Sequence, residues 1–81
     1  MNIVTSNSFS TATKKLDGFL KTKLKKQIQK VIDNPNIGKP LKYVHGERSI
    51  YIKPFRLVYT YSKAEDILYL LKFEHRRKVY D

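Results

Sequence analysis

Alternating hydrophobic and polar positions dominate the second half of the chain. Three such runs, at residues about 48–53, 56–61 and 67–73, predict three strands. The polar link at residues 62–66 is short enough for a hairpin loop between the last two strands. The apolar residues near the start predict a further short strand within residues 1–5. The chain therefore contains strands at both of its ends.

Helical spacing of apolar residues marks the first half of the chain. It predicts one helix at about residues 8–16, capped by Asn7 or Ser8, and a second helix at about 19–33. The second helix ends at Asn34, because a residue that precedes proline disfavours the helical region. The apolar positions of the two buried stripes are Phe9, Ala12, Leu16, Leu20, Leu24, Ile28 and Val31.

The order of these elements predicts an α+β fold in a single small domain, residues 1–81. The two helices would form an antiparallel hairpin that packs on one face of a mainly antiparallel four-stranded sheet. Residues 34–40 read as a loop, and residues 41–44 as a short extended piece. The second face of the sheet would stay at least partly open to a partner.

Strand parity decides which side chains of the hairpin at 48–61 share a face. If residues 53 and 56 pair across the turn, Lys53 and Arg56 point to the same side, together with Tyr51. The other face is more apolar and belongs against the helices, which leaves the Lys53/Arg56 face for solvent or ligand. A phosphate between the two cations would replace their repulsion by attraction. The alternative is two solvated cations on a wet sheet edge.

Net charge adds a class of partner to this picture. The chain has 17 Lys and Arg against 7 Asp and Glu, a formal charge of +10. A basic chain attracts polyanions such as nucleic acid, the ribosome, an acidic protein or an anionic membrane, although a highly charged solvated surface is the plainer alternative. There is no cysteine and no run of membrane-spanning length. We therefore expect a soluble, cytoplasmic protein.

The C-terminal tail combines cations with an aromatic ring. His75 can exchange a proton near neutral pH, and Tyr80 can stack on a nucleobase or pack against the sheet. The tail cations can clamp a phosphate or form a solvated charge run. With two histidines, no cysteine and no glycine-rich phosphate loop, the sequence predicts no metal site and no cofactor.

Taken together, these features resemble the RelE/ParE superfamily of toxins from type II toxin–antitoxin systems, and its RelE-like branch in particular. The resemblance covers nearly the whole chain. It rests on the lysine-rich helical hairpin and on the motifs Asn-Pro-x-Ile-Gly-Lys-Pro-Leu, Gly-Glu-Arg-Ser-Ile-Tyr-Ile, Pro-Phe-Arg-Leu-Val-Tyr and His-Arg-Arg-Lys-Val-Tyr. It implies a translation inhibitor that cleaves mRNA in the ribosomal decoding site. The implied reaction is metal-free attack of a ribose 2′-hydroxyl on the neighbouring phosphorus, which leaves a 2′,3′-cyclic phosphate.

The resemblance also implies residue roles. Arg56 matches the family arginine that holds the scissile phosphate, and Lys53 matches a strand-borne basic residue, whereas Tyr51 stands near the place of another basic residue. Either His75 or Arg76 matches the tail position that acts as acid or phosphate clamp. The expected catalytic residues are Arg56, Lys53 and His75, and the expected substrate-binding residues are Arg76, Tyr80, Arg48 and Tyr51.

The expected partners follow from the same resemblance. They are an acidic, RelB-like antitoxin, the ribosome with its mRNA, and operator DNA through the antitoxin, with no membrane. Two other functions stay open. A ParE-like poison of DNA gyrase would fit a chain with a tyrosine at residue 51 and no clear carboxylate base near Arg56. A degenerate toxin that only binds its antitoxin is the other.

Overall fold

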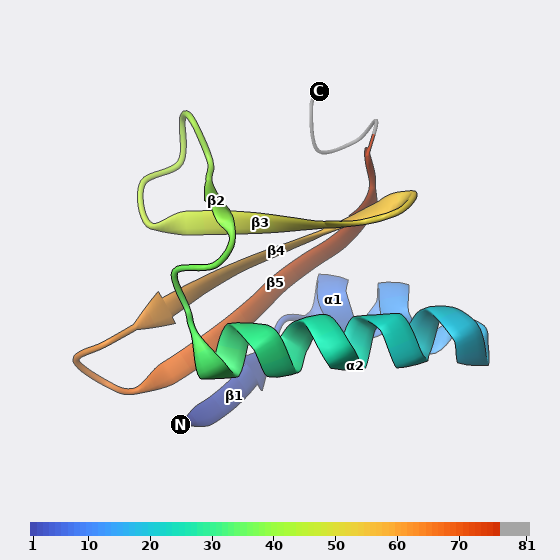
Figure 1. Ribbon diagram of the computed structural model, residues 1–81, viewed down its shortest axis with the longest axis horizontal. Coiled ribbons are helices and arrows are strands. Elements are labelled where there is room, and N and C mark those ends of the chain that lie inside the picture. Colours follow the sequence, from blue (N-terminus) through green and yellow to red (C-terminus); the bar gives the residue numbers. More distant parts are fainter. Residues whose placement is uncertain (77–81) are drawn as a thin grey trace.

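A computed structural model of the chain describes residues 1–76 (Figure 1). Its elements are β1 (Asn2–Thr5), α1 (Asn7–Lys14), α2 (Gly18–Asp33), β2 (Lys39–Pro40), β3 (Glu47–Ile52), β4 (Phe55–Ser62) and β5 (Ile67–His75). The strands form one sheet in the order β1-β5-β4-β3-β2, in which β1 runs parallel to β5 and the other neighbours are antiparallel. The predicted α+β class is confirmed.

The sheet differs from the prediction by one short strand. Lys39 and Pro40 pair with Ser49 and Arg48 of β3, whereas residues 41–44, which were predicted to be extended, form a bent loop. Phe55 also lies inside β4, where it pairs with Ile52 of β3 and His75 of β5, and its ring stacks on Phe73 of β5 at 4.8 Å between ring centres.

The inclusion of Phe55 in β4 moves the β3–β4 turn. Tyr51 stands opposite Arg56 and Ile52 opposite Phe55, so the turn is Lys53-Pro54 and the predicted pairing of residues 53 and 56 is wrong. The shift spans two residues, so it preserves parity. Tyr51 and Arg56 therefore share a face, as predicted.

Both helices begin at a side-chain cap. The Ser6 hydroxyl accepts a hydrogen bond from the Phe9 backbone N–H at 3.0 Å, and the Asp17 carboxylate accepts one from the Leu20 N–H at 2.8 Å. The first cap is thus Ser6 and not Asn7 or Ser8. The Ser6 hydroxyl also donates to the Leu71 carbonyl at 2.5 Å, which ties the start of α1 to β5.

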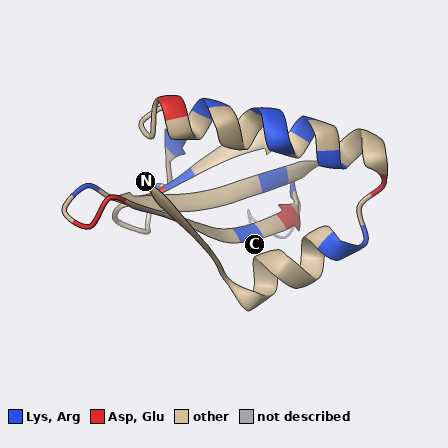
Figure 2. Ribbon diagram, turned by 90° about the horizontal axis from the view of Figure 1, so that it is seen from below, with Lys and Arg blue, Asp and Glu red and all other residues tan. Residues whose placement is uncertain are grey.

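The core lies between the sheet and the helices. In Figure 1 both helices lie below β3 and β4, and Figure 2, seen from below, shows them along opposite margins with lysines along much of α2. α1 packs against β5 and α2 against β3. The buried core residues are Phe9, Leu24, Val31, Ile52, Leu57, Tyr59, Leu68, Leu70 and Phe73.

Both outer strands are shorter than the strands they border. β2 pairs only with residues 48–49 of β3, and β1 only with residues 67–70 of β5. Among the described residues, the remaining parts of β3 and β5 therefore have no strand neighbour on their outer side. A depression lies at each of these two edges.

Candidate nucleic-acid site

The depression at the edge of β3 gathers two arginines around one tyrosine. It has a volume of about 450 Å³, and Arg56, Arg76 and Tyr51 line it. The Cζ atoms of Arg56 and Arg76 lie 5.8 and 5.4 Å from the centre of the Tyr51 ring. Tyr51 is nevertheless 45% exposed. Two guanidinium groups beside an exposed ring can hold a phosphodiester and an adjoining base together.

The strand neighbours of Arg56 fix its position. Its Nη1 donates a hydrogen bond to the Ser49 hydroxyl at 3.0 Å, and Ser49 is only 3% exposed. Ser49 precedes Tyr51 by two residues on β3, so both side chains lie on the face of Arg56. A half-buried guanidinium held in this way needs little rearrangement to meet an anion.

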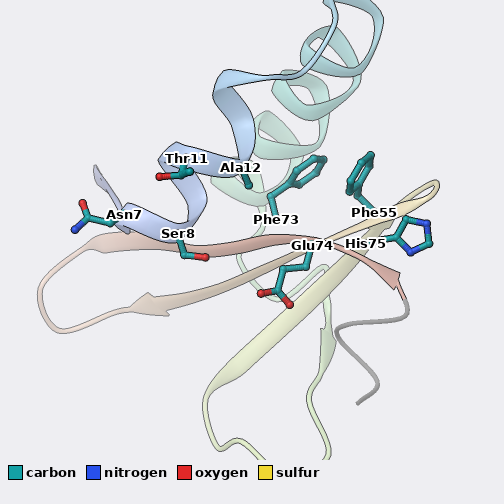
Figure 3. Close-up of a pocket in the computed structure, with 8 residues that line it drawn as sticks. All are labelled: Asn7, Ser8, Thr11, Ala12, Phe55, Phe73, Glu74 and His75. Carbon is teal, nitrogen blue, oxygen red and sulfur yellow. The ribbon is translucent and has the colours of Figure 1, made fainter.

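Glu74 is a neighbour of Arg56 that the sequence analysis missed, although it lines the depression at the edge of β5 and not the arginine depression. It stands directly opposite Arg56 on β5. Figure 3 shows the rings of Phe55 and Phe73 pointing toward the helices and the Glu74 carboxylate pointing the other way. The predicted strand ended at Phe73, so Glu74 was not assigned to a face. A carboxylate beside the arginine can accept a proton, which corrects the expectation that no carboxylate lies near Arg56.

His75 lies apart from Arg56. It follows Glu74 on β5, and neighbouring residues of a strand point to opposite faces, so its side chain lies on the face opposite to that of Glu74 and Arg56. It pairs with Phe55, and the two rings meet edge to face at 6.0 Å between centres. Both residues line the depression at the edge of β5, of about 520 Å³, together with Phe73 and the start of α1 (Figure 3). Arg76, and not His75, shares the depression of Arg56. Tyr80 lies outside the described residues.

Lys53 lies in the turn and borders a third depression. Lys23 and Lys26 of α2 line this hollow of about 220 Å³ with it. Tyr51 and Gln27 line both this depression and the one that contains Arg56. Lys53 is therefore a neighbour of the arginine site and not the cross-strand partner of Arg56 that was predicted.

Arg48 lies on the helix-side face of β3, opposite Tyr59 in register. Its Nη1 donates to the carbonyls of Gly38 at 2.8 Å and Asn36 at 3.2 Å. The Tyr59 hydroxyl accepts from the Gly38 N–H at 2.9 Å and donates to the Pro35 carbonyl at 2.7 Å. Burial raises the pKa of Tyr59, against the opposing effects of the Gly38 hydrogen bond and the Arg48 charge. Arg48 thus holds the loop before β2 and makes no contribution to the arginine depression.

Two features commonly sought in such a chain are absent from residues 1–76. No helix there is both long enough and apolar enough to cross a membrane. No three His, Cys, Asp or Glu side chains of this part gather as the ligands of a metal ion would.

Comparison with known proteins matches the sequence to a family of toxins. The family model described as "ParE toxin of type II toxin-antitoxin system, parDE" matches residues 3–80. No curated protein matches the chain.

Solved structures match the fold across nearly the whole chain. A chain of the intact RelBE toxin–antitoxin complex of E. coli is 19% identical with a TM-score of 0.82, covering 91% of this chain and 94% of that one. The YoeB/ParE toxin from Agrobacterium tumefaciens is 21% identical with a TM-score of 0.83, covering 94% and 99%. A chain of the RelB-RelE complex from Methanococcus jannaschii is 18% identical with a TM-score of 0.75, covering 96% and 95%.

Proposed function

The chain belongs to the ParE toxin family of type II toxin–antitoxin systems, and from this premise we propose that it inhibits translation by cleaving mRNA on the ribosome. The observation that carries the proposal is the grouping of Arg56, Arg76 and Tyr51 in one depression. A guanidinium fork suits a phosphodiester, and an exposed ring suits a base of any sequence. The net charge of +10 steers the chain toward RNA.

The proposed reaction needs no group besides the chain and the RNA. A ribose 2′-oxygen forms a bond to the neighbouring phosphorus, and the bond from phosphorus to the 5′-oxygen of the next nucleotide breaks. The products are a 2′,3′-cyclic phosphate end and a free 5′-hydroxyl. Arg56 and Arg76 stabilise the negative charge that grows on the phosphorane. One such donor typically contributes about 2.7–4 kcal/mol of transition-state stabilisation.

Two proton transfers accompany this reaction. The 2′-hydroxyl must lose its proton, and Glu74 is our preferred acceptor because it stands opposite Arg56 on the same face. The leaving 5′-oxygen must gain one. His75 and Lys53 stay the predicted donors, although one lies on the other face of β5 and the other in the turn.

Toe-printing of ribosome-bound mRNA in a cell-free extract tests the proposal. The wild type should generate new 3′ ends in the message. Arg56→Ala should lower the cleavage rate by about 10²–10³-fold, because it removes a donor to the phosphorane. Lys63→Ala removes one cation from the exposed β4–β5 loop and is the matched control. Arrest of synthesis by Arg56→Ala at the wild-type level contradicts the proposal.

One observation favours a second candidate, a poison of DNA gyrase that cuts no RNA. The residue opposite Arg56 is the uncharged Tyr51, and Lys53 lines a separate depression. Inhibition of supercoiling without mRNA cleavage would support this candidate. Harmless expression of the chain alone would instead indicate a degenerate toxin that only binds its antitoxin.

We also propose an acidic antitoxin as the partner of this chain, and operator DNA as a target through it. Structures with this fold include the toxin–antitoxin complexes RelBE and DinJ-YafQ of E. coli. A chain of charge +10 favours a partner of opposite charge, and a segment that folds on binding can cover a large part of a small basic domain.

A further inference from the structure

Three lysines from two separate elements surround the depression beside the arginine site. Lys23 and Lys26 come from α2, and Lys53 comes from the β3–β4 turn. The described residues that line this depression include no carboxylate. Like charges gathered around one hollow repel each other, and an anion bound between them would turn that repulsion into attraction. We call these three residues the lysine subsite.

The lysine subsite is continuous with the arginine depression. Tyr51 and Gln27 line both. The exposed Tyr51 ring therefore adjoins two guanidinium groups in one depression and three ammonium groups in the other. The order cation, aromatic ring, cation is also the order in which a single nucleic-acid strand presents a phosphate, a base and the next phosphate.

A second aromatic ring lies beside the lysine subsite. Phe19 is 69% exposed, and Lys23 Nζ lies 4.6 Å from the centre of its ring. Because Lys23 follows Phe19 by one helical turn, the two side chains share one side of α2. A large exposed ring that carries a cation provides a platform on which a further base can stack.

We propose that the lysine subsite binds the backbone phosphate next to the scissile one, so that single-stranded RNA runs from Arg56 across Tyr51 toward Phe19. This inference rests on the proposed function for the position of the scissile phosphate. Lys23 and Lys26 add a binding surface on α2 that the cleavage reaction itself does not require. The lysines hold the strand as point charges, so the subsite selects for charge and not for base sequence.

Salt-dependent binding of uncleavable RNA tests the lysine subsite. The probes are a labelled 2′-O-methyl dinucleotide, which has one phosphodiester, and a 2′-O-methyl hexanucleotide. The variant is Lys23→Gln/Lys26→Gln. The matched control, Lys21→Gln/Lys25→Gln, removes the same charge from exposed positions of the same helix that line neither depression. Fluorescence anisotropy gives the affinity at each salt concentration.

For the hexanucleotide, the slope of log K against log salt should become shallower by about 0.7 in the variant, since the subsite contacts one phosphate and each single-strand phosphate contact contributes about 0.7. The control should keep the wild-type slope, and all three proteins should bind the dinucleotide alike. Equal slope changes in variant and control would overturn the inference, because net charge alone would explain them. An unchanged slope in the variant would overturn it too. If the wild type binds neither probe, the inference fails, whereas the proposed function is decided separately by cleavage of ribosome-bound mRNA in the toe-printing assay.

Discussion

The β3–β4 hairpin carries two arginines in contrasting surroundings. Arg48 donates to the carbonyls of Asn36 and Gly38 on the helix side of the sheet. Arg56 projects from the other face of the sheet, beside the Tyr51 ring, and lines the open depression at the edge of β3. The alternation of side chains along a strand is what separates them. The face of the sheet, and not the charge, therefore distinguishes an arginine that holds a loop from one that can meet an anion.

Removal of the loop-holding arginine should give the largest change in stability. Arg48→Ala deletes a charged donor to two backbone carbonyls, and hydrogen bonds of this kind contribute about 1.5–3 kcal/mol. Urea unfolding monitored by circular dichroism should show a loss of this size. Lys63→Ala, an exposed cation in the β4–β5 loop, should leave the unfolding free energy within about 0.5 kcal/mol. Equal midpoints for Arg48→Ala and the wild type would show that the loop does not depend on Arg48.

A methyl group at Gly38 should disturb the same loop by crowding. Its Cβ would lie 2.8 Å from the Tyr59 hydroxyl and 3.0 Å from the Ser49 carbonyl. Overpacking of this kind costs about 1–3 kcal/mol. The control, Gly18→Ala, has no atom within 4 Å of the new Cβ and should be neutral or stabilise by up to about 1 kcal/mol. The account of the loop would be wrong if both alanines had the same sign of effect on the unfolding free energy.

Raising the pH should produce the smallest of these changes in the free energy of unfolding, through Tyr59. Burial raises the pKa of Tyr59 above its ordinary value of about 10. The unfolded chain then releases this proton first, so the stabilisation is complete below about pH 10 and is lost as pH rises through the folded pKa. Tyr59→Phe should make the free energy of unfolding depend less on pH above about pH 10. Tyr43→Phe alters an exposed ring and is the control, and identical profiles for the two variants would contradict the assignment.

Much of the fold could be predicted from local pattern. The helical spacing of the apolar residues around Phe9 and around Leu24 predicted two helices. The alternation of apolar and polar residues predicted the three long strands. The turn was missed because its position depends on the stacking of Phe55 on Phe73, a contact between residues distant in sequence. Helix caps and two-residue strands likewise depend on contacts that a local pattern does not contain.

The site was predictable only in part, for the same reason. Parity placed Tyr51 with Arg56 correctly even though the expected register was wrong. Parity also assigns Arg48 to the helix face, but the carbonyls that receive its hydrogen bonds come from a loop whose position the pattern cannot give. Glu74 was missed because β5 continues past the last apolar residue, where pairing with β4 and not hydrophobicity sustains the strand.

The most direct test of the central claim is a side-chain NMR titration with the uncleavable 2′-O-methyl dinucleotide. The Nε–Hε resonances of Arg56, Arg76 and Arg48 report separately on the two faces of the hairpin. The account predicts saturable shifts of Arg56 and Arg76 with a common dissociation constant, and an unchanged Arg48 resonance. Shifts confined to Arg48, or no shift of Arg56 at concentrations that saturate binding, would contradict it.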